Sequence, residues 1–360
     1  MAYKISGTLN ENARILVLKE SDWSIESNVE KSAGSYEVDS LVSGTKTVVA
    51  IDGNGEIVGY GSVSPEFYGG DRGVFGGGYN GSSSENTIDY ITISTTGDAT
   101  DFGDLTVARR YPAGSSNGTN DRGVFGGGYT TTNVIDYITI SSTGNATDFG
   151  DLTAARYSLS ATSNGTNDRG VFGGGDASGD SNIIDYITIS STGNATDFGD
   201  LVIVRDYLAA CSNGTNDRGV FAGHSTEVNS IDYITISSKG NATDFGDLTG
   251  IRQALAATSN GTNDRGVFGG GYDDANFINI IDYITISSTG NATDFGDLTG
   301  TRLQAAGTSN GTNDRGVFGG GFTGSAINII DYITISSEGN AQDFGDLTVA
   351  RRDMGATSDA

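Results

Sequence analysis

Residues 121–153 read DRGVFGGGYTTTNVIDYITISSTGNATDFGDLT, a stretch with two apolar runs, a glycine triplet and a Phe-Gly-Asp-Leu ending. Near-copies of it fill most of the chain, and the triplet DRG begins at residues 71, 121, 168, 217, 264 and 314. The period is therefore 47 to 50 residues over six copies. The copies are rich in β-branched and aromatic residues and show no helical periodicity. A repeat of this length and composition is typical of one small sheet in a ring of sheets.

Each copy divides into four strand-like segments. In the second copy they are RGVFGGG (122–128), IDYITIS (135–141), ATDFGDLT (146–153) and RYSLSATSN (156–164). The run IDYITI has apolar residues on both faces, which predicts a strand packed between two neighbouring sheets. The succession VFGGG, IDYITI, DFGDL and Ala-Arg resembles the blade of a kelch-type β-propeller. That resemblance implies that the Arg-led segment is the innermost strand of the following blade.

Counting the segments predicts how the ring closes. Each of the four kinds occurs six times, so the first blade lacks an innermost strand and the last ten residues, RRDMGATSDA, are a spare one. Pairing the two would leave no open edge. We therefore expect an all-β protein, with a six-bladed kelch-like propeller at 65–360 that is closed by residues 351–359.

Residues 1–64 lie outside the repeat. The segments YKISGTL, ARILVLKE, GSYEVDSL, TKTVVAID and EIVGYGSV alternate apolar and polar residues between turn signals, which predicts a small antiparallel β-sandwich. The segment resembles the transthyretin-like or carboxypeptidase-regulatory sandwich, and this resemblance implies an anchoring domain. The intervening DGNGE (52–56) favours a hairpin turn over a calcium loop.

Charge and composition exclude several partners. The net charge is −25, with 45 acidic and 20 basic residues, which disfavours binding to nucleic acid and to anionic membranes. A single cysteine excludes an internal disulfide framework and a cysteine-based zinc site. The chain shows neither a signal peptide nor an apolar window of the roughly 18 residues that a membrane helix needs. We expect a soluble protein, made in a cytoplasm and without membrane insertion.

The copies differ mainly in the loop after the glycines and just after the blade-opening arginine. In an up-and-down blade both connections emerge at one face, where variable loops on a rigid scaffold commonly carry recognition. The alternative, that solvent-exposed loops drift without a role, stays open. The candidate ligand-binding residues in these loops are Tyr79, Asn80, Tyr129, Asp176, His224, Tyr272, Asp273 and Phe322.

Enzyme chemistry finds little support in the sequence. His224 is the single histidine, so a nucleophilic triad is not expected and we predict no catalytic residues. A glycosidase needs only two carboxylates, but nothing singles out an acid–base pair. The repeated Asp and Asn residues of the turns could bind calcium. We favour the interpretation that these residues cap turns and pair with the arginine of DRG. We therefore predict no cofactor.

The sequence IDYITISSTGNATDFGDLT, followed by AR and a later RGVFGGG, resembles the propeller repeats of virion structural proteins of marine tailed phages, including cyanophages. The resemblance covers residues 70–360. It implies a virion structural protein of the tail, fibre or neck, but no known ligand. From the one-sided loop variation, the absent chemistry and the two-part layout, we expect the N-terminal domain to dock to other virion proteins and the propeller to contact a host-surface glycan or protein. We also expect a homo-oligomer in the particle. Two alternatives are a decoration or assembly protein with only virion-protein contacts and a depolymerase of surface polysaccharide.

Overall fold

In a computed structural model of the chain, the described part comprises residues 71–358, apart from 117, 119–120, 130–131, 165–166, 215, 225–227, 262 and 310–313. It also includes the backbone of seven strands between residues 3 and 67. The chain divides into two compact units, residues 1–69 and 70–360. Across the described residues every regular element is a strand, which confirms the all-β class. No helix in this part is long and apolar enough to cross a membrane.

The first unit contains two antiparallel sheets. One has the order β4-β1-β7 and the other β3-β2-β5-β6. The five predicted strands coincide with β1, β2, β4, β5 and β6, and the structure adds β3 and β7. Packing of the two sheets face to face, as the predicted sandwich requires, lies outside the described residues, as does the 52–56 turn. The bounds are β1 (Tyr3–Leu9), β2 (Ala13–Lys19), β3 (Ile25–Lys31), β4 (Gly34–Leu41), β5 (Lys46–Ile51), β6 (Ile57–Val63) and β7 (Glu66–Phe67).

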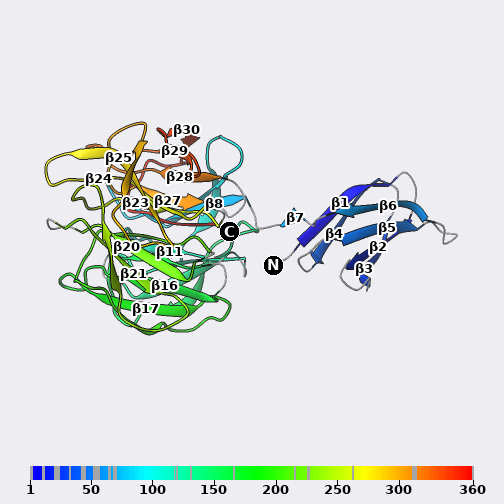
Figure 1. Ribbon diagram of the computed structural model, residues 1–360, viewed down its shortest axis with the longest axis horizontal. Coiled ribbons are helices and arrows are strands. Elements are labelled where there is room, and N and C mark those ends of the chain that lie inside the picture. The colour runs from blue at the N-terminus through cyan, green and yellow to red at the C-terminus, as the bar shows by residue number, and fades with distance from the viewer. Residues whose placement is uncertain are drawn as a thin grey trace. The chain divides into compact units, whose positions relative to one another are not determined.

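The second unit is a six-bladed β-propeller of four-stranded antiparallel sheets (Figure 1). The innermost strands are β31 (Gly355–Ser358), β11 (Ala113–Ser115), β15 (Ser160–Thr162), β19 (Ala209–Cys211), β23 (Ala256–Thr258) and β27 (Ala306–Ser309). The second strands are β8 (Arg72–Gly76), β12 (Arg122–Gly126), β16 (Arg169–Gly173), β20 (Arg218–Ala222), β24 (Arg265–Tyr272) and β28 (Arg315–Gly319). The third strands are β9 (Thr87–Thr92), β13 (Val134–Thr139), β17 (Ile183–Thr188), β21 (Ser230–Thr235), β25 (Phe277–Thr285) and β29 (Ile329–Thr334). The outer strands are β10 (Thr100–Asp104), β14 (Thr147–Asp151), β18 (Thr196–Asp200), β22 (Thr243–Asp247), β26 (Thr293–Asp297) and β30 (Gln342–Asp346).

The C-terminal strand closes the ring, as the segment count predicted. Strand β31 pairs with β8, so the first blade has the order β10-β9-β8-β31 and joins the two ends of the propeller. Every other innermost strand follows the outer strand of the preceding blade, which confirms the offset between sequence repeat and blade. Because β31 covers the inner edge of β8, no second strand is left with an unpaired edge.

The core lies between adjacent blades. Ile88 packs with Val74 and Phe102 toward the second blade, where Phe125 lies. Ile91, three residues further along the same strand, packs instead against Val317 and Phe344 of the sixth blade. The IDYITI strand is therefore buried on both faces, which is why its pattern is apolar on both faces.

A turn of each blade is hydrogen-bonded to the outer strand of the blade before it. The amide of Gly144 donates to Phe102 O at 2.8 Å, and Asn145 Oδ1 accepts from the amide of Asp104 at 3.1 Å. This turn leaves no room for a side chain at Gly103, since a Cβ there would lie 2.5 Å from Gly144 O. The repeated Phe-Gly-Asp therefore reflects close approach of two backbones.

A buried ion pair joins each blade to the connection that enters it. The blade-opening arginine contacts the aspartate of IDYITI, and both side chains are almost fully buried. The pairs are Arg109–Asp136 (2.9 Å), Arg156–Asp185 (3.0 Å), Arg205–Asp232 (2.8 Å), Arg252–Asp282 (2.6 Å), Arg351–Asp89 (2.6 Å) and Arg302–Asp331.

Candidate functional site

The two variable connections of the blades meet at one face. The residue after the blade-opening arginine forms a β-bridge with the residue after the glycine cluster, as in Arg110 with Tyr129, Gln253 with Tyr272 and Arg352 with Tyr79. We call this surface the variable face. In Figure 1 the tip of the β24–β25 hairpin marks it at the left of the propeller.

Aromatic rings and two arginines form an arc on the variable face. The guanidinium of Arg110 lies 4.8 Å from the ring centroid of Tyr79 and 4.3 Å from that of Tyr129. Tyr129 contacts Tyr157 edge to face at 5.4 Å, and Tyr157 lies 5.9 Å from Tyr111. Cation–π contacts hold the guanidinium over these rings while their outer surfaces stay accessible.

The arc continues on the other side of Tyr79. Arg352 lies 5.4 Å from the ring of Tyr79 and 4.3 Å from that of Phe322, and Phe322 contacts Phe277. The predicted residues Tyr79, Tyr129 and Phe322 are thus brought into one arc, and Tyr272 touches it through Phe277 at 5.9 Å.

The remaining predicted residues have other surroundings. Asn80 and Asp273 each accept hydrogen bonds from amides two and three residues later, so they shape their own turns. Asp176 does the same and also accepts from the Tyr157 hydroxyl at 2.8 Å, which raises the pKa of Tyr157 to about 12. His224 lies outside the arc, where burial lowers its pKa and the Asp180 carboxylate opposes that shift.

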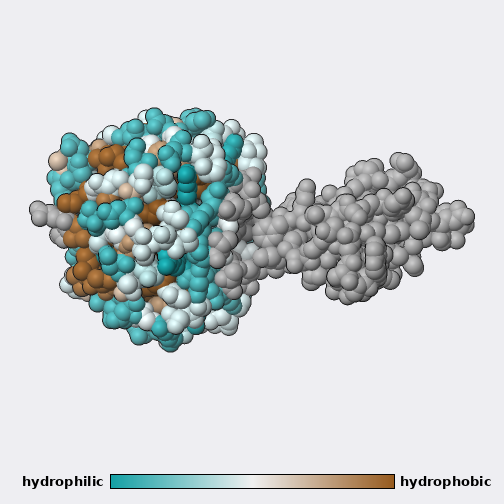
Figure 2. Space-filling model, in the orientation of Figure 1, coloured by the Kyte–Doolittle hydropathy of each residue, from teal (hydrophilic) through white to brown (hydrophobic). Residues whose placement is uncertain are grey.

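Apolar side chains are exposed along the segments that lead from the outer strands to the innermost strands. The segments that cross the variable face toward the innermost strands expose several aliphatic residues, and Figure 2 shows apolar residues gathered at the left side of the propeller. These exposed residues are Val107, Val202, Val204, Ile251 and Val349.

A ring of left-handed residues surrounds the propeller axis at this face. The second residue after each blade-opening arginine has φ between 50° and 61°, although none of the six is glycine: Tyr111, Ser158, Tyr207, Ala254, Gln304 and Asp353. Their backbones are joined by hydrogen bonds such as Tyr111 N to Asp353 O at 2.7 Å and Gln304 N to Ala254 O at 2.7 Å. Left-handed backbone at a non-glycine residue costs about 1–3 kcal/mol and is concentrated at functional sites.

The same six residues line a small axial pocket. It holds about 80 Å³, the space of a few water molecules. Gln304 Nε2 donates to the Tyr111 hydroxyl at 3.0 Å. The Tyr207 hydroxyl donates to the same Tyr111 hydroxyl at 3.5 Å. Ser158 Oγ is buried there without a hydrogen-bond partner among the described residues.

Asp353 places a carboxylate in this pocket. Neither of its oxygens has a hydrogen-bond partner among the described residues, and the nearest cation is Arg352 Nε at 3.5 Å from Oδ2. Burial raises the pKa of Asp353 to about 7, although the charges of Arg352 and Arg110 oppose the shift. The pocket therefore places a buried carboxyl group beside the Tyr111 hydroxyl and the Arg352 guanidinium, both of which favour its charged form.

Replacing this carboxyl by its neutral isostere tests the raised pKa. The folded protein keeps the proton up to about pH 7, whereas the unfolded chain releases it near pH ~4. Stability should therefore fall as pH rises between these values. We expect Asp353→Asn to stabilise the protein at pH 8 by about 2–4 kcal/mol and to have little effect at pH 4.

Urea denaturation at several pH values measures this difference. Asp274→Asn, which changes an exposed carboxylate on a variable loop, serves as the control. An equal effect of Asp353→Asn at pH 4 and at pH 8 would contradict the pKa shift.

The repeated acidic residues have partners within the fold. Asp121 accepts from the amide of Ser141 at 2.8 Å and from its hydroxyl, which agrees with the predicted role in capping turns. The predicted pairing with the arginine of DRG is wrong in the second copy, since Arg122 donates to Ile189 O of the next blade at 3.0 Å and stacks on Tyr137. The aspartates of IDYITI pair instead with the blade-opening arginines.

The residues at the axis were missed in the sequence. Tyr111, Tyr207, Gln304 and Asp353 belong to the variable positions after the blade-opening arginine, whereas the candidates were taken from the loop after the glycines. A signal was present in the sequence, because the second residue after the blade-opening arginine varies among the copies. It is tyrosine in two of them and a different residue in each of the other four.

No model of a known protein family matches this chain, and the search of curated proteins gives no match. The geometry of the variable face therefore carries the functional argument.

Proposed function

We propose that the propeller is a glycan-binding module of a virion structural protein. The arc of partly exposed rings and arginines beside a polar axial pocket carries this proposal. Aromatic faces stack on the C–H faces of sugars, while guanidinium, amide and hydroxyl groups pair with sugar hydroxyls. A few polar groups among apolar side chains at one concave site are typical of ligand recognition.

The kelch-like and phage-like sequence of the repeats supports the virion part of the proposal. In this proposal, residues 1–64 dock to other virion proteins, and the propeller presents the variable face to the host surface. The loops differ where the rings of the arc lie, while the strands and the opposite turns are nearly uniform. A rigid scaffold with one diversified face suits selection for different receptors.

The single thiol is not available as a nucleophile. Burial raises the pKa of Cys211 to about 12, because the side chain packs in the core between two blades. At pH 7 it stays protonated and does not act as a nucleophile.

The test is binding of the full chain to a glycan array and to host cells. We expect Tyr129→Ala with Tyr157→Ala to weaken binding at least ~10-fold, because stacking of two aromatic rings is worth about 1–3 kcal/mol. Both rings are partly exposed, so the fold should persist.

The matched control is Tyr332→Ala, which removes an aromatic ring in the middle of β29 and should leave binding unchanged. Glycan binding that survives the double replacement would contradict the arc as the site. Attachment only to other virion proteins would favour an assembly role, and release of sugar from surface polysaccharide would favour a depolymerase.

A further inference from the structure

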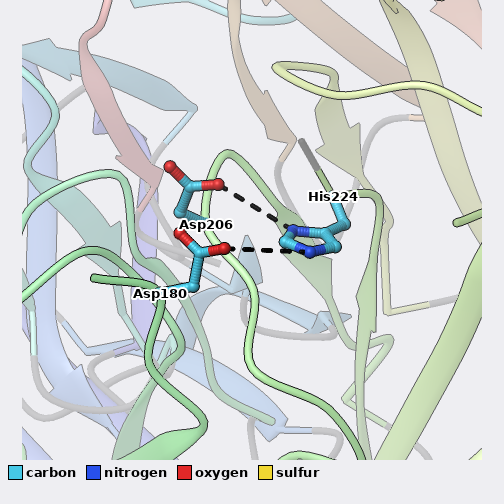
Figure 3. A group of neighbouring side chains, drawn as sticks. All are labelled: Asp180, Asp206 and His224. Atoms are coloured by element: carbon cyan, nitrogen blue, oxygen red, sulfur yellow. Dashed lines mark ion pairs between the residues drawn. The ribbon is translucent and has the colours of Figure 1, made fainter. Parts of the chain in front are cut away.

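Three single-copy residues converge between the third and fourth blades. Asp180 lies in the connection from β16 to β17, Asp206 directly follows Arg205, and His224 lies after β20. Figure 3 shows the imidazole with both nitrogens turned toward the two carboxylates. His224 Nε2 lies 3.9 Å from Asp180 Oδ2, and Nδ1 lies 3.9 Å from Asp206 Oδ1. One donor atom from each residue lies within 4.8 Å of the other two.

One nitrogen of the histidine is buried without a close partner among the described residues. Its side chain is 5% exposed, and Nδ1 is buried without a hydrogen-bond partner among the described residues. A neutral imidazole has one N–H and one lone pair. An imidazolium would donate from both nitrogens, but neither carboxylate is within hydrogen-bond distance, since both separations are 3.9 Å. A metal ion bound to one nitrogen and to both carboxylates would satisfy these groups.

Comparison of the copies shows that His224 is a departure from the repeat. Its amide donates to Arg252 O, as the amide of Gly175 donates to Arg205 O in the preceding blade. His224 therefore occupies the place of the third glycine in the VFGGG cluster, which is AGH only in this copy.

The two carboxylates also stand where other copies have different residues. Asp206 corresponds to Gln253 of the fifth blade, and Asp180 corresponds to Ser84 of the first blade through its bridge to Asp176. Independent drift in three separate segments would not be expected to bring three metal-ligating side chains to one point.

We propose that Asp180, Asp206 and His224 bind one divalent transition-metal ion of the Zn²⁺ class. Imidazole nitrogen with carboxylate oxygen suits Zn²⁺ or Mn²⁺, whereas Ca²⁺ and Mg²⁺ prefer oxygen ligands throughout. A single ion takes one imidazole nitrogen, so ligand bonds of about 2.0–2.2 Å require the donor atoms, now within 4.8 Å of one another, to draw closer. Asp180 lies on an exposed loop with its side chain 34% exposed, so it can make this movement.

The surroundings leave the site acidic. The nearby cation Arg205 is held by Asp232 at 2.8 Å, so its charge is compensated within the blade. Three protein ligands leave further coordination positions of the ion open, as in zinc sites that take an exogenous ligand. The ion would also join the loops of two blades at the variable face.

Calorimetric titration of the metal-free full chain with Zn²⁺ tests the proposal. We expect one ion per chain, retained in excess Mg²⁺, and a rise in Tm on binding. His224→Gln, Asp206→Gln and Asp180→Ser should each weaken binding more than ~10-fold, since even outer-shell changes cost 10–100-fold. The last two introduce the residues of sibling blades, so they should fold even if the histidine variant does not.

Asp273→Asn, on the loop of the fifth blade, is the matched control and should bind Zn²⁺ as the wild type does. Zn²⁺ affinity that is unchanged in Asp206→Gln and Asp180→Ser would overturn the proposal. So would the absence of binding to the wild type, or a stoichiometry near six that points to the repeated turns.

Discussion

Removing residues 351–360 is expected to open the ring between the first and sixth blades and to abolish the folded propeller. Strand β31 supplies four paired residues to β8: Gly355 with Gly76, Ala356 with Phe75, Thr357 with Val74 and Ser358 with Gly73. The deletion also removes Arg351, which pairs with buried Asp89 and donates to Gly77 O and Thr87 O.

Two separate losses add up in this deletion. Leaving the Asp89 carboxylate buried without its cation costs about 3–5 kcal/mol, and the exposed edge of β8 becomes a template for aggregation. The whole stability of a domain is only about 5–15 kcal/mol. Circular dichroism during heating and size-exclusion chromatography should therefore show an unfolded or aggregated protein.

A chain ending at Ser358 is the control, because it keeps all of β31. It should melt as the full chain does. If the chain ending at residue 350 melts at the wild-type temperature as a monomer, the closing role of this strand is wrong.

Asp136→Asn is expected to destabilise the propeller by about 3–5 kcal/mol, the usual result of removing one partner of a buried ion pair. Asp136 accepts from Arg109 Nη2 at 2.9 Å and from the amide and hydroxyl of Thr106 at 3.2 and 2.5 Å. Burial lowers the pKa of Arg109 and Asp136 opposes this shift, yet an arginine stays charged in proteins. The neutral amide would leave that charge uncompensated between two blades.

The matched control is an exposed pair on the same fold. Arg265 Nη2 lies 3.4 Å from Glu338 Oε1, with side chains 23% and 50% exposed, so Glu338→Gln should change stability by less than about 1 kcal/mol. Urea denaturation of both variants measures the contrast. A shift below about 1 kcal/mol for Asp136→Asn would show that the buried pairs are not needed to hold adjacent blades.

The sequence predicted the blades because their strands repeat in a fixed order. Counting the Arg-led segments was sufficient to assign β31 to the first blade, and the copies showed which loops vary. This variation also identified Tyr79, Tyr129 and Phe322 as candidate ligand-binding residues. The axial residues could not be found in this way, because Tyr111, Gln304 and Asp353 come from separate repeats and meet only where six blades converge.

The metal-ligand cluster shows the same limit. His224 is the single histidine of the chain, and a lone histidine carries no geometry in the sequence. Asp180 and Asp206 come within reach of it because blade 3 contributes its loop and the entering connection of blade 4 lies beside that loop.

The all-β class, the number of blades, their closure and the diversified face all follow from the amino-acid sequence. Each of these depends on local periodicity and on segment order, which a linear chain displays directly. Tertiary structure alone decided the buried arginine–aspartate pairs, the left-handed axial ring and the grouping of Asp180, Asp206 and His224. These depend on burial and on distances between residues of different repeats, and both quantities exist only once the ring has closed.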